Sequence, residues 1–246
     1  MSGPASFPST QWDVVRSLKR ESQRTYALGL LFETYRDAIH AYVRRRVGNS
    51  DRADDLTQAF FTHALERRAL EKADGTHRFR AFLLTSLRNF VANELSRERA
   101  LRRGGGRVGA PPHKGAARHG SPGDEPFHNL TPEALFNVHW ALCQLQRTLN
   151  DLRLDFERRG KREWFDALKP CLFRSRPVSC ASIARTLNVS EGAVRVAVHR
   201  LREQFKARLA AEIARSVSDP AEAADELRFL IRNLSAAGST RARDLT

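Results

Sequence analysis

The sequence has too few cysteines and too little continuous apolar sequence for several classes of protein. Its 246 residues include three cysteines, an odd number without CxxC spacing, which argues against a disulfide framework and a zinc knuckle. No apolar run approaches the roughly 20 residues that a membrane span needs, and the N-terminus lacks the basic start and apolar stretch of a signal peptide. We therefore expect a cytoplasmic protein without membrane contact, whose Cys143, Cys171 and Cys180 are buried, reduced thiols.

Motifs of catalysis and metal binding are also missing. The sequence contains no HExxH, no Walker loop and no GxSxG, and its eight histidines are scattered without ligand spacing. Its densest acidic group, Asp51, Asp54 and Asp55, stands at the expected start of a helix, where an N-cap role is simpler than a metal site. We expect no enzymatic activity and no cofactor.

Positive charge, in contrast, is abundant. Lys and Arg number 42 and Asp and Glu 28, which gives a net charge of +14 and favours a polyanionic partner such as nucleic acid. Gly104, Gly106 and Gly109 match GxGxxG, but arginines precede them and prolines follow, so the strand and helix that a dinucleotide site needs are absent. The surrounding Gly, Pro and basic residues predict a flexible linker over residues 102–130.

Apolar periodicity predicts an all-α protein with one helical domain on each side of this linker. From residue 12 to 101 the apolar residues show helical spacing and no alternating strand pattern. Thr131 and Pro132 predict the start of a long helix, whose apolar stripe runs to Phe156 and suits packing within one domain or a coiled-coil dimer. The expected boundaries are an N-terminal extension 1–27, a helical domain 28–101, the linker 102–130, a second domain 131–211 and a C-terminal extension 212–246.

The second domain contains the pattern of a helix-turn-helix. The segments "SCASIARTLN" and "EGAVRVAVHRL" each have a short apolar face, and the turn between them ends in the capping residue Ser190. Packing of the second helix on the first leaves one outward-facing set free for the major groove, in which an arginine can contact a guanine edge. This set is Arg195, Val196, His199 and Arg200. The alternative interpretation is a solvated basic face on an ordinary helix.

The N-terminal half contains a second candidate for nucleic-acid binding, residues 79–103. This segment mixes phenylalanines, the amides of Asn89 and Asn93, and a run of arginines. Unstacked bases need a stacking surface and hydrogen-bond partners while cations hold the phosphates, so the mixture suits single-stranded DNA. Each phenylalanine could equally be a core residue.

Taken together, the two halves resemble a bacterial RNA polymerase sigma factor of the extracytoplasmic-function type. The segment "DLTQAFF" resembles the signature on the helix that docks on the polymerase clamp, which implies polymerase-binding roles for Asp55, Gln58 and Phe61. The segment "FRAFLLTSLRNFVANELSR" resembles the one that melts and captures the downstream promoter element, which implies DNA-binding roles for Phe82, Asn89, Asn93 and Arg97.

The resemblance spans roughly residues 28–209 and implies a function. The expected partners are core RNA polymerase and promoter DNA, with the upstream element read by the helix-turn-helix; an anti-sigma factor or another regulatory partner is compatible with this role. The alternative is a stand-alone helix-turn-helix regulator whose N-terminal half is a dimerisation or sensor module.

The C-terminal extension lies beyond the resemblance. Asp219 and Pro220 predict a helix start, and an apolar stripe from Leu227 to Leu234 predicts an amphipathic helix. So short a helix must dock to be stable in water. We expect it to cover apolar surface on the second domain; the alternative is a reversible contact that restrains the helix-turn-helix.

Overall fold

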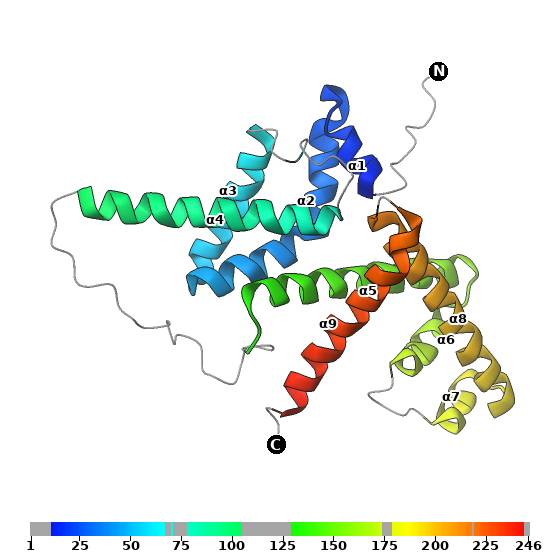
Figure 1. Ribbon diagram of the computed structural model, residues 1–246. Helices are drawn as coiled ribbons and strands as arrows, with labels where there is room; N and C mark the ends of the chain where they lie inside the picture. The colour runs from blue at the N-terminus through cyan, green and yellow to red at the C-terminus, as the bar shows by residue number, and fades with distance from the viewer. Residues whose placement is uncertain are drawn as a thin grey trace. The chain divides into compact units, whose positions relative to one another are not determined.

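The computed structural model describes residues 11–66, 70, 78–104, 129–173, 179–217 and 219–243 (Figure 1). Every regular element in these ranges is a helix, and no strand occurs in them. The predicted all-α class is therefore confirmed. Most of the predicted linker, residues 105–128, lies outside the described residues.

The helices form two compact units that differ in their boundaries from the predicted domains. The first unit comprises Met1–Leu142 together with Ala214–Thr246, and the second comprises Cys143–Ile213. One division falls inside α5 (Pro132–Arg158) and the other inside α8 (Glu191–Ser216). The C-terminal tail therefore belongs to the same unit as the N-terminal helices.

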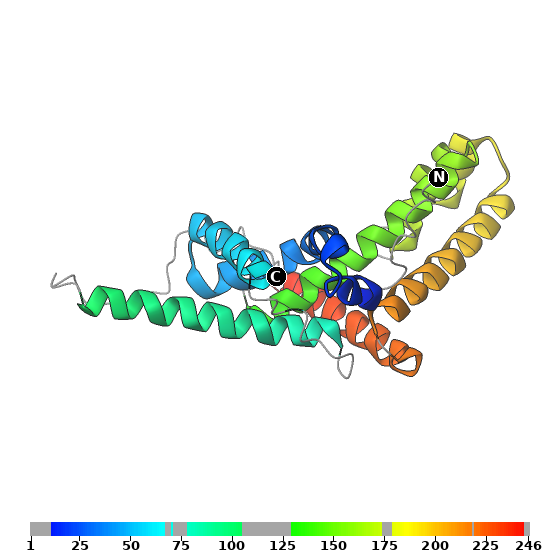
Figure 2. The ribbon, with the colours of Figure 1, turned by 90° about the horizontal axis from the view of Figure 1, so that it is seen from above.

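In the first unit, α2, α3 and α4 lie beside one another (Figure 2). Buried aromatic and aliphatic side chains fill the space between them, including Tyr35, Tyr42, Phe60 and Leu87. A short first helix packs on α2, and the tail contributes a 3-10 helix and a long helix. The elements of this unit outside α5 and α8 are α1 (Gln11–Ser17), α2 (Glu21–Val47), α3 (Ser50–Glu66), α4 (Phe79–Gly104), η3 (Pro220–Glu222) and α9 (Ala223–Arg243).

The turn between α2 and α3 corrects the predicted cap. Gly48 ends α2 with φ 73°, a left-handed conformation that favours glycine, and its N–H donates to the Arg44 carbonyl at 2.8 Å. The side-chain oxygen of Asn49 then accepts the Arg52 N–H at 2.8 Å. Asn49 is thus the N-cap of α3, and the prediction of a cap from the acidic group at 51–55 was wrong.

The acidic residues inside α3 have other roles. Asp51 lies in the first turn, where a negative charge suits the helix dipole. The Asp54 carboxylate lies 3.4 Å from His40 Nε2 and 3.7 Å from Arg36 Nη2, both on α2. Asp54 therefore helps to join α3 to α2, which its position in the sequence does not reveal.

Helix α5 buries more of its surface than the predicted stripe. The capping of its start is confirmed, since the Thr131 hydroxyl accepts the Ala134 N–H at 3.1 Å. Leu135 and Val138 of the stripe are buried, but so are Phe136 and Trp140, which lie outside it and are completely inaccessible. A single apolar stripe predicts one buried face, whereas this part of α5 also buries a second face, which carries Phe136 and Trp140.

The second unit packs around one apolar cluster. The last turns of α5 contact α6 (Arg162–Leu168), η2 (Lys169–Leu172), α7 (Cys180–Leu187) and α8 through this cluster. Cys171 and Cys180 are partly buried against it, and none of the three cysteines forms a disulfide. The three thiols are therefore reduced, as expected, but half-buried rather than buried. The members of the cluster are Leu149, Leu152, Phe165, Leu168, Ile183, Ala184, Val194 and Leu201.

We predict that protonation of His139, on α5 in the first unit, destabilises the fold. Burial lowers the pKa of its imidazole and His40 lowers it further, while Asp37 opposes both. The folded state therefore favours neutral His139, and stability should fall as the pH drops below 6.5, the ordinary value for the unfolded chain. Urea unfolding between about pH 7.5 and 5.5 should show a smaller loss of stability in His139→Gln than in the wild type. Equal losses in both proteins would contradict this prediction.

Candidate polymerase and nucleic-acid interfaces

The predicted polymerase-binding residues on α3 divide into two groups. Asp55 and Gln58, three residues apart, share an exposed face of the helix. Neither side chain forms an ion pair or hydrogen bond within the part of the chain that the structure describes. These two polar groups are available to a partner.

Phe61, the third of these residues, packs within the first unit. Its ring centroid lies 4.6 Å from that of Phe32 on α2 and 5.7 Å from that of Phe60, both in edge contact. Phe61 is half-buried as a result. The ring contact with Phe32 joins α3 to α2. Phe61 therefore helps to fix the position of the helix that carries Asp55 and Gln58.

On α4 the predicted DNA-binding residues form a polar line. Asn89 and Asn93 are exposed, one helical turn apart, and Arg97 follows after another turn. The Arg97 guanidinium donates to the Glu94 carboxylate at 2.9 Å, but its side chain remains 72% exposed. Two amides and one cation therefore project from a single face of α4.

The phenylalanines of α4 belong mostly to the core. Phe79 and Phe90 are buried, Phe79 against Tyr35 and Phe90 against Phe60. Phe82 is half-buried, with its ring centroid 6.3 Å from that of Phe79. Of these three aromatic rings, Phe82 alone retains a partly accessible surface.

In the second unit, α7 and α8 are joined by a tight three-residue turn. Asn188 ends α7 in the left-handed conformation, with φ 52°, and its N–H donates to the last turn of the helix. The Ser190 hydroxyl accepts the Ala193 N–H at 3.2 Å, so the predicted cap of α8 is confirmed. Ile183 and Val194, one on each helix, are buried in the shared cluster.

All four residues predicted to read the major groove are exposed on α8. Arg195 is held by Glu191 of the preceding turn at 3.3 Å, and its side chain is 69% exposed. Val196 is 51% exposed, an unusual setting for a valine, and His199 and Arg200 are exposed as well. The helix therefore presents this set to solvent.

Two members of the set also line a groove of about 450 Å³ within the second unit. Val196 and Arg200 form one wall, and Phe156 and Trp164 form part of the apolar lining opposite. Lys161, from the turn between α5 and α6, adds a second cation. The sequence pattern of α8 alone does not predict this groove, because its other wall comes from residues about 30 to 40 positions earlier.

Arg202, another basic residue of α8, has a structural role. Its Nε and Nη2 donate to the Cys171 carbonyl at 3.1 and 2.7 Å. The guanidinium thereby ties η2 to α8 and stabilises the placement of the helix.

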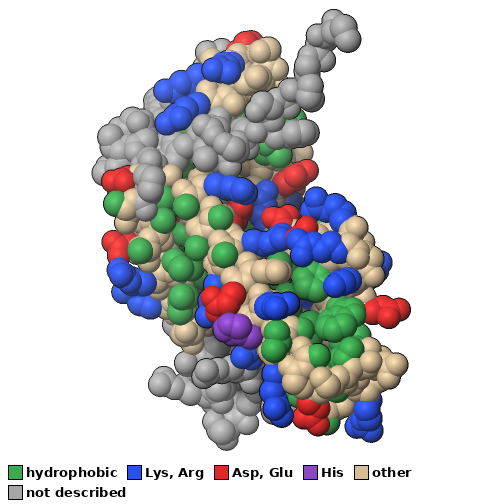
Figure 3. Space-filling model, turned by 90° about the vertical axis from the view of Figure 1, so that its right-hand side faces the viewer, with side chains coloured by type: hydrophobic (Ala, Val, Ile, Leu, Met, Phe, Trp, Pro, Cys, Tyr) green, Lys and Arg blue, Asp and Glu red, His purple; other side chains and the backbone are tan. Residues whose placement is uncertain are grey.

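Basic side chains are common on the face of the protein shown in Figure 3, where hydrophobic side chains lie between them.

A buried charged cluster, which was not predicted, joins α9 to the start of α4. Arg80 Nε lies 2.9 Å from Glu226 Oε1, and the two side chains are 8% and 1% exposed. Arg80 also donates to Asn137 on α5, and its guanidinium carbon lies 5.0 Å from the Trp140 ring and 4.1 Å from the Phe229 ring. The tail therefore docks within the first unit, against the start of α4, through a contact that was not predicted.

Within the described residues, no group of three or more His, Cys, Asp or Glu side chains is placed to hold a metal ion. A helix with the length and apolar character to cross a membrane is likewise not found among them.

A comparison with family models matches part of the first unit. Residues 31–101 match the family model of sigma-70 region 2. The chain is also 37% identical over 73 residues to the ECF RNA polymerase sigma factor BldN of Streptomyces coelicolor. That similarity covers 30% of the chain and 27% of the relative, so the chain spans just over a quarter of the relative's length. The range matched by the family model contains α3 and most of α4.

Proposed function

We propose that this chain directs core RNA polymerase to promoters in the cytoplasm. It belongs to the sigma-70 family through the region 2 domain at residues 31–101, and it is related to the extracytoplasmic-function members of that family. The observation that carries this proposal is that polar side chains are exposed on two helices of the region 2 domain. Asp55 and Gln58 on α3, and Asn89 and Asn93 on α4, are all exposed, while the phenylalanines around them pack inward.

We assign the exposed face of α3 to core polymerase. A carboxylate and an amide three residues apart on one helix can accept and donate hydrogen bonds to a partner helix. Phe61 supports this face through its packing on Phe32. A rigid helix presents the two polar groups in fixed positions, which lowers the entropic cost of binding.

We assign the polar line of α4 to the melted promoter strand. The amides of Asn89 and Asn93 can hydrogen-bond to the edges of unstacked bases, and Arg97 can contact a phosphate if it leaves Glu94. The accessible part of Phe82 offers a surface for stacking. Hydrogen bonds and stacking on the single strand offset the cost of unpairing, which amounts to a few kcal/mol per base.

We assign α8 to duplex DNA at the upstream promoter element. Its N-terminal half carries Arg195, Val196, His199 and Arg200 on an exposed face, and arginine can form two hydrogen bonds to guanine in the major groove. An anti-sigma factor or another regulatory partner would act on either unit. In this role the chain itself catalyses no reaction.

Transcription with purified components tests the proposal. The protein is added to bacterial core polymerase with genomic fragments selected by the combined complex, and transcript start sites are mapped. Defined new start sites that depend on the protein are expected. A stand-alone helix-turn-helix regulator would bind duplex DNA without polymerase and start no transcripts with the core enzyme, and that result would overturn the proposal.

We predict that Arg195→Ala with Arg200→Ala lowers affinity for duplexes selected by the wild-type protein, and lowers affinity for scrambled duplexes much less. Each lost base contact should cost about 1–3 kcal/mol of discrimination. Arg153→Ala is the matched control, since Arg153 forms an (i, i+4) ion pair with Glu157 at 3.5 Å, as Arg195 does with Glu191. Competition binding measures both effects; equal losses on selected and scrambled DNA would argue against base reading by α8.

A further inference from the structure

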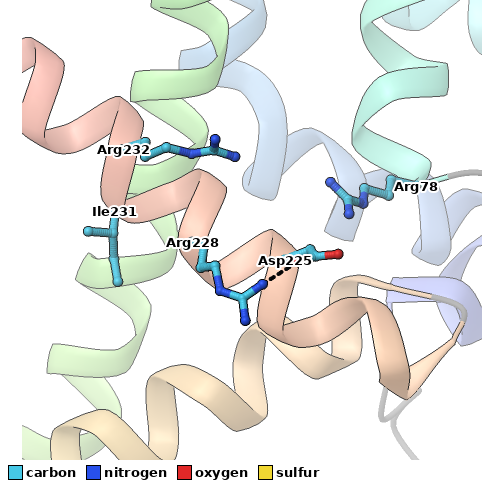
Figure 4. Close-up of a pocket in the computed structure, with 5 residues that line it drawn as sticks. All are labelled: Arg78, Asp225, Arg228, Ile231 and Arg232. Atoms are coloured by element: carbon cyan, nitrogen blue, oxygen red, sulfur yellow. Dashed lines mark hydrogen bonds and ion pairs between the residues drawn. The ribbon is translucent and has the colours of Figure 1, made fainter.

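A hollow of about 600 Å³ lies between the residue preceding α4 and the outer face of α9, both in the first unit. Figure 4 shows the side chains that line it. Three of the five are arginines from two separated parts of the sequence, and one is an acid. The lining residues are Arg78, Asp225, Arg228, Ile231 and Arg232.

The lining carries an excess of two positive charges, from three arginines and one aspartate. Arg228 is paired with Asp225 at 2.6 Å. Arg232 forms no ion pair with any residue that the structure describes. In Figure 4 the side chains of Arg78 and Arg232 extend toward one another across the hollow, so two like charges face each other there.

The nearby carboxylates only partly neutralise Arg78. Its Nη1 lies 2.9 Å from Glu226, but that carboxylate is already held by Arg80 in a buried pair. Its Nε lies 3.6 Å from Glu222, beyond hydrogen-bonding distance. The Nη1 of Arg78 therefore shares the Glu226 carboxylate with Arg80. The Nε of Arg78 has only the more distant Glu222 carboxylate as a partner.

The geometry points to a binding site for a phosphate group, and we propose that the hollow takes one from a nucleic-acid backbone or from a free nucleotide. Arg228 and Arg232 are four residues apart and lie on one face of α9, opposite Arg78. Guanidinium groups bind phosphate oxygens through paired hydrogen bonds, which lysine cannot reproduce. Ile231, 53% exposed beside them, provides an apolar surface for a sugar or base. The nucleic-acid form of the proposal rests on the proposed function; the nucleotide form does not.

The test uses the full chain and three probes in isothermal titration calorimetry: pyrophosphate, a nucleoside triphosphate and a single-stranded oligonucleotide of about ten nucleotides. Arg228→Ala with Arg232→Ala should weaken binding of the preferred probe about tenfold. The matched control is Arg16→Ala with Arg20→Ala. These two exposed arginines are also four residues apart and also belong to the first unit, but they do not line the hollow. The control should leave pyrophosphate and nucleotide affinity unchanged, and should weaken oligonucleotide binding far less than the hollow variant.

A second variant gives a change in the opposite direction. Asp225→Asn removes the acid that lines the hollow, keeps its shape and releases Arg228, so it should tighten binding several-fold. Both changes are at exposed positions of α9, and melting temperatures check that the variants fold. Weakened binding by folded Asp225→Asn would overturn the proposal.

The probes separate the two sources of phosphate. Variant-sensitive binding of pyrophosphate and the triphosphate supports a free nucleotide, and variant-sensitive binding of the oligonucleotide alone supports a nucleic-acid backbone. If the hollow variant and the control weaken every probe equally, or if no probe binds, the hollow is not a phosphate site. None of these outcomes depends on transcription, so failure here is distinguishable from failure of the proposed function.

Discussion

Replacing Glu226 by alanine is expected to destabilise the first unit by about 3–5 kcal/mol, because the change leaves the buried Arg80 without its acidic partner. Glu226 is 1% exposed and is contacted by both Arg78 and Arg80. Arg80 is itself enclosed by Trp140 and Phe229. Water cannot readily solvate the orphaned guanidinium there, so the desolvation penalty is no longer offset.

Urea unfolding followed by tryptophan fluorescence measures this loss. Trp140 lies 5.0 Å from the Arg80 guanidinium carbon and reports on the cluster directly. Because Trp164 belongs to the second unit, a Trp164→Phe background removes its contribution to the signal. Asp225→Ala is the matched control, since it removes a carboxylate from the same helix at a site 62% exposed, where an ion pair contributes little.

A double variant separates the ion pair from the packing around it. Arg80→Met with Glu226→Met removes both charges and keeps apolar volume between the rings. Its loss of stability should be smaller than the sum of the two single losses, because neither charge is left unpaired. If Glu226→Ala costs no more than Asp225→Ala, the buried pair does not hold the tail to the first unit.

This cluster also shows why the location of the tail could not be predicted. In the sequence, Arg80 and Glu226 are charged residues within amphipathic helices, and such residues are usually solvated. They are 146 positions apart, and their pairing depends on the tertiary fold. The apolar stripe of the tail correctly predicted a helix that docks, but an apolar stripe carries no information about which surface it covers.

Local signals, by contrast, gave reliable predictions. Thr131 and Ser190 cap their helices as predicted, because capping involves residues only two or three positions apart. The cap of α3 was misassigned because several polar residues compete at its start, and Asn49 lies just before the acidic group. Sequence alone does not rank neighbouring candidates for one cap.

The candidate interfaces follow the same division. Exposure of Asn89, Asn93 and Arg195 could be predicted from helical periodicity, since their neighbours form the apolar stripes. The inward packing of Phe61 and the hydrogen bonds from Arg202 to Cys171 could not, because each depends on a contact with another element. Motif resemblance proposes candidate residues, whereas the packing of each side chain depends on the tertiary fold.

Asp55→Ala with Gln58→Ala is expected to weaken binding to core polymerase about 100-fold, which corresponds to two lost polar contacts of about 1.5 kcal/mol each. Both side chains are exposed and unpaired among the described residues, so their removal should leave the helix content unchanged. Fluorescence anisotropy of labelled protein with core polymerase, in the absence of DNA, measures the affinity.

The matched control is Asp54→Ala, which removes the same charge one residue away. Asp54 is directed to His40 and Arg36 of α2 and is 55% exposed, so this change should alter stability little and leave polymerase affinity within about twofold. Equal affinity losses in the two variants would indicate that net charge, rather than the exposed face of α3, determines binding. Unchanged affinity in a folded double variant would remove α3 from the interface, because a helix that binds through two polar groups cannot lose both without weakening the complex.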